Sequence, residues 1–128
     1  VDSIKLAEEI DRHAGRIGKC QDILIEVNIG GEKSKSGIAA SGLEELVYQV
    51  SELENIRVRG LMAIPPAGSS ERFLFDMQKL YIDISQKKIH NISMDYLSMG
   101  MSGDYEAAIK YGANMVRIGR GLFGPRNY

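Results

Sequence analysis

The chain alternates between short apolar runs and helical patterns, and this alternation restricts its fold more than any other feature. Four runs are rich in Ile, Val, Leu or Met and are bounded by Gly, Pro, Ser or Asn: residues 22–29, 56–64, 94–101 and 115–119. The first and last runs begin at positions 22 and 115, which lie three units of 31 residues apart. Each run is predicted to form a β-strand.

Helical patterns occupy the remaining stretches, at residues 3–15, 41–53, 70–88 and 102–111. Ser3 and Ser41 are expected to cap the first two helices, and Gly112 is expected to end the fourth. Their apolar residues recur at helical spacing, so we interpret each stripe as a face that packs on the core.

This order predicts an α/β protein with parallel strands covered by helices. A (β/α)8 TIM barrel of about 250 residues also has roughly 31 residues per unit, so the chain is expected to form four consecutive barrel units. An open doubly wound sheet is the alternative. Half a barrel leaves two open edges. We therefore expect a piece of a longer polypeptide, an association with a missing half, or an open sheet.

Composition excludes several classes of protein. The chain has 16 Lys and Arg against 17 Asp and Glu, which argues against a strongly basic nucleic-acid binder and against attraction to anionic membranes. Cys20 is the only cysteine, so no internal disulfide or cysteine-based zinc site can form, and a cytoplasmic location is expected. No apolar run approaches the ~20 residues of a membrane span. The first residues do not resemble a signal peptide. His13 and His90 lack ligand spacing, so no metal site is expected.

The last predicted strand carries a charge on its inner side. Alternation directs Val116 and Ile118 toward the helices and Arg117 inward, where a guanidinium needs an anion or another acceptor. Residues 119–124 then form a glycine-rich turn whose backbone N–H groups can approach a phosphate closely. The alternative is a tight strand-to-helix turn that leaves Arg120 on the surface.

Other polar residues meet at the same predicted strand ends. Ser102 begins the fourth helix, where the N-terminal amides favour phosphate; alternatively it only caps its own helix. Glu26 and Asn28 face inward in the first strand, and Glu26 either lines a pocket or pairs with Arg117 in a buried ion bridge. Gly60 indicates the close approach of backbone or ligand.

Three motifs carry a family resemblance: ILIEVNI at residues 23–29, SMGMS at 98–102 and VRIG at 116–119. With them the sequence resembles the pyridoxal phosphate homeostasis protein family, which has the fold of the alanine racemase N-terminal domain. The resemblance covers essentially the whole chain and corresponds to the C-terminal half of the family. It implies that residues 1–128 form one partial domain, the last four βα units of a barrel that binds pyridoxal 5′-phosphate (PLP).

The resemblance also implies roles for individual residues. Ser102 is expected to hold the phosphate with Ser98 nearby, and Gly119 and Arg120 to complete the cradle. Arg117 is expected at the pyridine nitrogen, which it would keep unprotonated, weakening the ring as an electron sink. The full set of candidate cofactor-binding residues is Asn28, Met62, Ser98, Met99, Ser102, Arg117, Gly119 and Arg120. The implied function is intracellular PLP homeostasis without robust catalytic activity.

Two departures accompany this resemblance. The lysine that holds PLP covalently in the family belongs to the first barrel strand and is absent from this chain, and Arg120 stands where many relatives carry Thr or Ser. The expected partners are PLP or phosphate and either the missing barrel half or a second copy, with no nucleic acid or membrane. Two alternatives remain: a PLP-dependent amino-acid racemase, for which Tyr96 and Tyr105 are the only nearby phenols, and a barrel fragment without a ligand.

Overall fold

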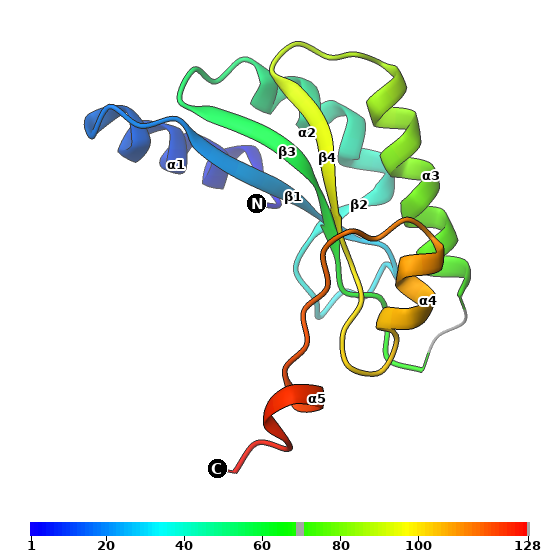
Figure 1. The fold of residues 1–128 in the computed structure, drawn as a ribbon. Coiled ribbons are helices and arrows are strands. Elements are labelled where there is room, and N and C mark those ends of the chain that lie inside the picture. The colour runs from blue at the N-terminus through cyan, green and yellow to red at the C-terminus, as the bar shows by residue number, and fades with distance from the viewer. Residues whose placement is uncertain (69–70, 128) are drawn as a thin grey trace.

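A computed structural model describes residues 1–68 and 71–127. A four-stranded parallel sheet in the order β2-β1-β3-β4 carries helices along one side (Figure 1). The strands are β1 (Gln21–Asn28), β2 (Ile38–Ala39), β3 (Ile56–Ala63) and β4 (Ile92–Ser98). The helices are α1 (Ile4–Arg16), α2 (Leu43–Ser51), α3 (Arg72–Gln86), α4 (Tyr105–Lys110) and α5 (Arg120–Phe123), with a 3-10 turn η1 (Ala40–Gly42) before α2. No helix among the described residues is long and apolar enough to cross a bilayer.

The predicted serine N-cap is found at the start of α1 but not at the start of α2. The Ser3 hydroxyl accepts a hydrogen bond from the Leu6 N–H at 3.1 Å, which confirms the predicted cap. Ser41 does not cap α2, because it lies inside η1 and α2 begins only at Leu43. The predicted start of the third helix at Ser70 lies outside the described residues.

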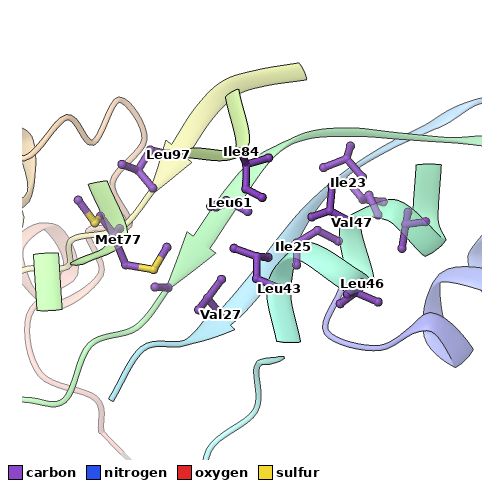
Figure 2. Packing of buried hydrophobic residues seen from close by; sticks show 14 of the residues in the cluster. Ile23, Ile25, Val27, Leu43, Leu46, Val47, Leu61, Met77, Ile84 and Leu97 are labelled. Atoms are coloured by element: carbon purple, nitrogen blue, oxygen red, sulfur yellow. The ribbon is translucent and has the colours of Figure 1, made fainter. Parts of the chain in front are cut away.

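The core lies between the sheet and helices α2 and α3. Register aligns Ile25, Leu61 and Leu97 across β1, β3 and β4, all on the face toward these helices (Figure 2). The predicted alternation of β1 is confirmed, because its isoleucines and valine are buried there. The helices contribute the other labelled core residues: Leu43, Leu46, Val47, Met77 and Ile84. Full burial of one such aliphatic side chain contributes about 1.5–3 kcal/mol.

The predicted strand at residues 115–119 is wrong in its extent, although the α/β class with parallel strands is confirmed. Met115 makes one parallel bridge with Ser98, and the N–H of Arg117 donates to the carbonyl of Gly100 at 2.9 Å. The segment thus starts beside β4 as the next strand would. No described strand pairs with the side of this segment that faces away from β4, so residues 115–119 do not form a strand of the sheet. The fourth strand of the sheet is instead β2, a two-residue edge strand that the sequence pattern did not indicate.

The face of the sheet opposite the core is not covered by α1, α2 or α3 (Figure 1). Two rows of residues cross it in register: Leu24, Gly60 and Tyr96, and then Glu26, Met62 and Ser98. Tyr96 is 37% exposed, and Leu24, Glu26 and Met62 are half-buried. This is the face that a complete barrel would enclose.

Gly60 lies where the backbones of β3 and β4 approach most closely. Its φ is +157°, and a Cβ added to it would lie 1.8 Å from the carbonyl oxygen of Tyr96. The register of β3 shifts at this point against both neighbouring strands. The close approach predicted from the sequence is therefore one of backbone to backbone.

A single cation links three strands on the open face. Arg59 Nη1 lies 2.9 Å from a carboxylate oxygen of Asp22, and its Nε lies 2.6 Å from one of Asp95. The guanidinium also lies over the Tyr96 ring, 5.4 Å from its centroid. Hydrogen bonds from Arg59 and then from Ser93 lower the pKa of Asp95.

Substituting Gly60 with alanine should destabilise the protein strongly. The added methyl must displace the β4 backbone, and the positive φ adds strain, so we expect a loss of about 2–5 kcal/mol in the free energy of unfolding. Urea denaturation measures this. Gly103→Ala is the control, because a Cβ there meets no atom within 4 Å. Equal stability of Gly60→Ala and Gly103→Ala would contradict the close approach.

The Asp95 pair should make stability depend on pH. A carboxyl with a lowered pKa in the folded state stabilises the protein above its unfolded pKa of about 4, and this contribution is lost as the pH falls through the folded value. Asp95→Asn should therefore be less stable than the parent protein at pH 7, and the difference should shrink in acid. Urea unfolding at pH 7 and pH 3 tests this, with Asp83→Asn on the exposed side of α3 as the control. A difference that is the same at both pH values would exclude the ion pair as its cause.

Candidate functional site

A cavity of about 850 Å³ lies at the carboxyl end of the sheet. Its walls come mainly from the loop after β3, the loop after β4 and the C-terminal segment from Arg117 to Arg126, with Lys35 from the loop after β1. In a parallel sheet this end is where ligands bind. Three parts of the chain that are far apart in sequence therefore share one concave surface.

Arg117 lines this cavity and contacts the last residues of β3 and β4. Its Nη2 donates to the Ala63 carbonyl at 3.0 Å, and its Nη1 donates to the hydroxyl of Ser98 and, at 3.4 Å, to the Ser98 carbonyl. Burial lowers the pKa of the Arg117 guanidinium, while Glu26 and Asp104 act in the opposite direction. The inward orientation predicted from strand alternation is found, and the acceptors that satisfy the charge are protein oxygens.

A direct hydrogen bond joins the two loops that the sequence predicted to converge. The Ser102 hydroxyl oxygen accepts from the Gly121 N–H at 2.9 Å. Ser102 does not cap α4, because Asp104 takes that position and accepts from the Met101 N–H at 2.7 Å. Since its oxygen is the acceptor in this bond, the Ser102 hydroxyl keeps its own proton available to donate.

Backbone donors surround this junction. Within residues 1–68 and 71–127, the N–H groups of Ser102, Gly103, Gly119 and Arg120 have no hydrogen-bond acceptor. A Cβ built on Gly103 or Gly119 would meet nothing within 4 Å, so both glycines border open space. This arrangement offers several donors to one anion.

Glu26 does not pair with Arg117 in the described part of the chain, so the predicted alternative of a buried ion bridge is not found. The Ser36 hydroxyl donates to Glu26 at 2.9 Å instead. Register places Met62 between Glu26 and Ser98 on the open face. The loop of residues 30–37 thus contacts β1 through Ser36, which donates a hydrogen bond to the Glu26 carboxylate.

Four of the eight candidate residues line the cavity: Ser102, Arg117, Gly119 and Arg120. Ser98 is buried and does not line the cavity, but its hydroxyl accepts a hydrogen bond from Arg117, which does. Met62 lies beside Ser98 in register on the open face of the sheet and does not line the cavity.

Two other candidates have structural roles in this chain. The side-chain amide of Asn28 donates to the Glu32 carbonyl at 2.7 Å and accepts from the Glu32 N–H at 3.2 Å, so it holds the loop after β1. Met99 is fully buried in the core. Neither residue lines the cavity.

The cavity also contains residues that the sequence analysis did not select. Pro65 and Pro66 form part of the wall after β3, and Met101 and Phe123 add apolar surface. The Pro-Pro pair at the end of β3 is a sequence signal that could have identified this wall of the cavity. Phe123 has no such signal, because its position depends on where α5 lies. Among the described residues, no three His, Cys, Asp or Glu side chains gather as a metal site would require.

Comparison with known proteins identifies the family of this chain. The sequence model of the family described as "Alanine racemase, N-terminal domain" matches residues 1–127. A pyridoxal phosphate homeostasis protein of Aquifex aeolicus is 41% identical over 132 residues, which cover 100% of this chain and 57% of that protein. The chain thus spans about half the length of the curated relatives it matches.

Solved structures show the same fold. PipY of Synechococcus elongatus PCC7942, solved with PLP bound, superposes with a TM-score of 0.87 at 31% identity over 97% of this chain and 58% of PipY. The alanine racemase of Clostridium difficile 630, at 18% identity over 100% of this chain and 36% of that chain, has a TM-score of 0.75 and supports the TIM-barrel fold alone. The chain therefore belongs to the alanine racemase N-terminal domain family, in which its relatives of about 40% identity are pyridoxal phosphate homeostasis proteins.

Proposed function

We propose that the protein binds PLP and serves PLP homeostasis, and that this chain supplies the part of the site that holds the phosphate and the ring. The names of the curated relatives and the PLP bound to PipY support this proposal. The cavity volume of about 850 Å³ lies within the usual range for cofactor sites.

The observation that carries the proposal is the Ser102–Gly121 junction in the cavity that Arg117 also lines. A phosphate dianion needs several donors and nearby positive charge. The Ser102 hydroxyl and the four backbone N–H groups around it supply the donors, and the half-buried Arg117 guanidinium adds positive charge to the same cavity. We assign the phosphate to this junction.

Arg117 would face the pyridine nitrogen of the cofactor. A guanidinium only donates hydrogen bonds and stays protonated, so it favours a pyridine nitrogen without a proton. PLP supplies an electron sink when bound, and an unprotonated ring is a weak one. This supports a carrier of PLP more than an enzyme with rapid turnover.

The lysine that would hold PLP covalently is proposed to come from outside this chain. No strand of the sheet contains a lysine. Lys35 lines the cavity, but its ammonium lies 3.0 Å from Glu32 Oε1 in an ion pair. We propose that residues 1–128 are the last four βα units of a barrel and that the remaining units cover the open face; a second copy of the chain is the alternative. The exposed, unpaired Cys20 supports a cytoplasmic location.

The full-length protein should take up PLP. Titration should produce the absorption band of covalently bound PLP, because the remaining barrel units would add the lysine. Mass spectrometry of the intact protein checks whether a longer polypeptide carries this chain. Absence of both the band and any PLP binding would refute the proposed function.

Ser102→Ala should weaken PLP binding about tenfold, because it removes one hydrogen bond to a charged phosphate and the acceptor of the Gly121 N–H. Equilibrium dialysis of the full-length protein measures the change. Ser85→Ala, on the exposed side of α3, is the matched control. The phosphate assignment fails if both variants bind PLP like the parent protein.

Arg117→Ala should weaken PLP binding by about 1.5–3 kcal/mol, the contribution of a charged hydrogen bond. The variant also leaves the Ala63 carbonyl without its donor, so urea unfolding must be measured alongside. Arg117→Lys keeps the charge and should bind PLP with intermediate affinity. Unchanged affinity in a folded Arg117→Ala protein would remove Arg117 from the site.

A further inference from the structure

Glu26 differs from the other carboxylates on the open face of the sheet because it has no cationic partner. Asp22 and Asp95 share the guanidinium of Arg59. The Glu26 carboxylate accepts a hydrogen bond from the Ser36 hydroxyl at 2.9 Å, and in the described part of the chain it forms no ion pair. Its negative charge is therefore not compensated by a contact within residues 1–68 and 71–127.

The two cations nearest to Glu26 in the fold are held by other groups. Arg117 donates to oxygens at the ends of β3 and β4. Burial lowers the pKa of Arg117 and Glu26 raises it, so the two charges act on each other without an ion pair. Lys35 lies in the loop after β1, and its ammonium is 3.0 Å from Glu32 Oε1.

The backbone fixes Glu26 on the open face at the level of the site. On one edge of β1 the Glu26 N–H donates to the Val1 carbonyl at 2.8 Å, and on the other edge Glu26 pairs in register with Met62, which pairs with Ser98. In a barrel, inward-facing side chains at one level form a layer. Glu26 thus belongs to the same layer as Ser98, whose hydroxyl accepts a hydrogen bond from Arg117.

Enclosure of this face makes the missing cation necessary. Glu26 is half-buried even while the face is open. If the remaining barrel units cover it, an unpaired carboxylate in the interior is costly, whereas a paired one is tolerated. No strand of the sheet contains a lysine, so the cation must come from those units. The proposed function already requires them to bring a lysine to the PLP ring.

We infer that Glu26 is the counter-ion of the lysine that holds PLP in the complete protein. The inference rests on the proposed function, because that function supplies the lysine. When PLP is attached, the lysine nitrogen replaces the aldehyde oxygen, which leaves as water, and the nitrogen can carry a proton before and after this exchange. A neighbouring carboxylate favours the protonated form. Ser36 orients the carboxylate through its hydrogen bond.

The first test needs no bound PLP. Borohydride reduction of the PLP-loaded full-length protein, followed by peptide mass spectrometry, identifies the lysine. Urea unfolding of the PLP-free protein then compares the parent, Glu26→Gln, the lysine-to-methionine variant and the double variant. Glu26→Gln should lower the urea midpoint of the parent and should no longer lower it once the lysine is replaced. Glu54→Gln, at an exposed position before β3, is the control and should change neither background.

The second test follows the proton on the lysine nitrogen. The absorption band of covalently bound PLP is titrated with pH in the full-length protein. In Glu26→Gln the midpoint of this titration should fall by about one pH unit or more, because the positive charge loses its counter-ion. Ser36→Ala keeps the carboxylate and removes only its hydrogen bond, so its midpoint should fall by less.

Either of two results overturns the inference while leaving the proposed function intact: additive effects of the two substitutions on unfolding, or an unchanged pH midpoint in Glu26→Gln. A parent protein that takes up no PLP and yields no reduced lysine adduct refutes the proposed function, and the role of Glu26 is refuted with it.

Discussion

The contact between the backbones of Gly60 and Tyr96 determines how β3 and β4 lie against each other. Beyond this contact the two strands run in register to their ends, with Leu61 beside Leu97 and Met62 beside Ser98. Leu61 and Leu97 face the core, whereas Met62 and Ser98 lie on the opposite face, where the Ser98 hydroxyl accepts a hydrogen bond from Arg117. Core packing and site geometry thus depend on the same backbone approach, which only glycine permits without displacement of β4.

The polar groups of the site form hydrogen bonds with one another in this structure, without a ligand. Arg117 binds the ends of two strands, Ser102 binds the turn before α5, and Asp104 holds the loop between them. Such mutual hydrogen bonding keeps the donors oriented toward the cavity, and preorganised donors bind an anion at a lower entropic cost than mobile ones.

The sequence predicted the elements with strong local periodicity. The helix that begins after Ser3 and the alternation of Ile23, Ile25 and Val27 are properties of neighbouring residues, and both are found. The strand at residues 115–119 was wrong because a strand needs partners on its flanks, and this information is not local. The convergence of Ser102 with Gly121 followed from the rule that parallel strands end at one edge. The structural roles of Asn28 and Met99 could not be predicted in this way, because they depend on contacts between segments that are distant in the sequence.

The weak attachment of α5 has a consequence for dynamics. Leu122 and Phe123 are 72% and 85% exposed in this structure, so the helix buries little apolar surface, and the Gly121–Ser102 bond joins it to the loop after β4. In this chain taken alone, a segment with so few buried contacts opens at a low free-energy cost. A molecule bound between α5 and that loop would tether the C-terminal segment, and by thermodynamic linkage occupancy of the cavity and ordering of this segment must favour each other to the same degree.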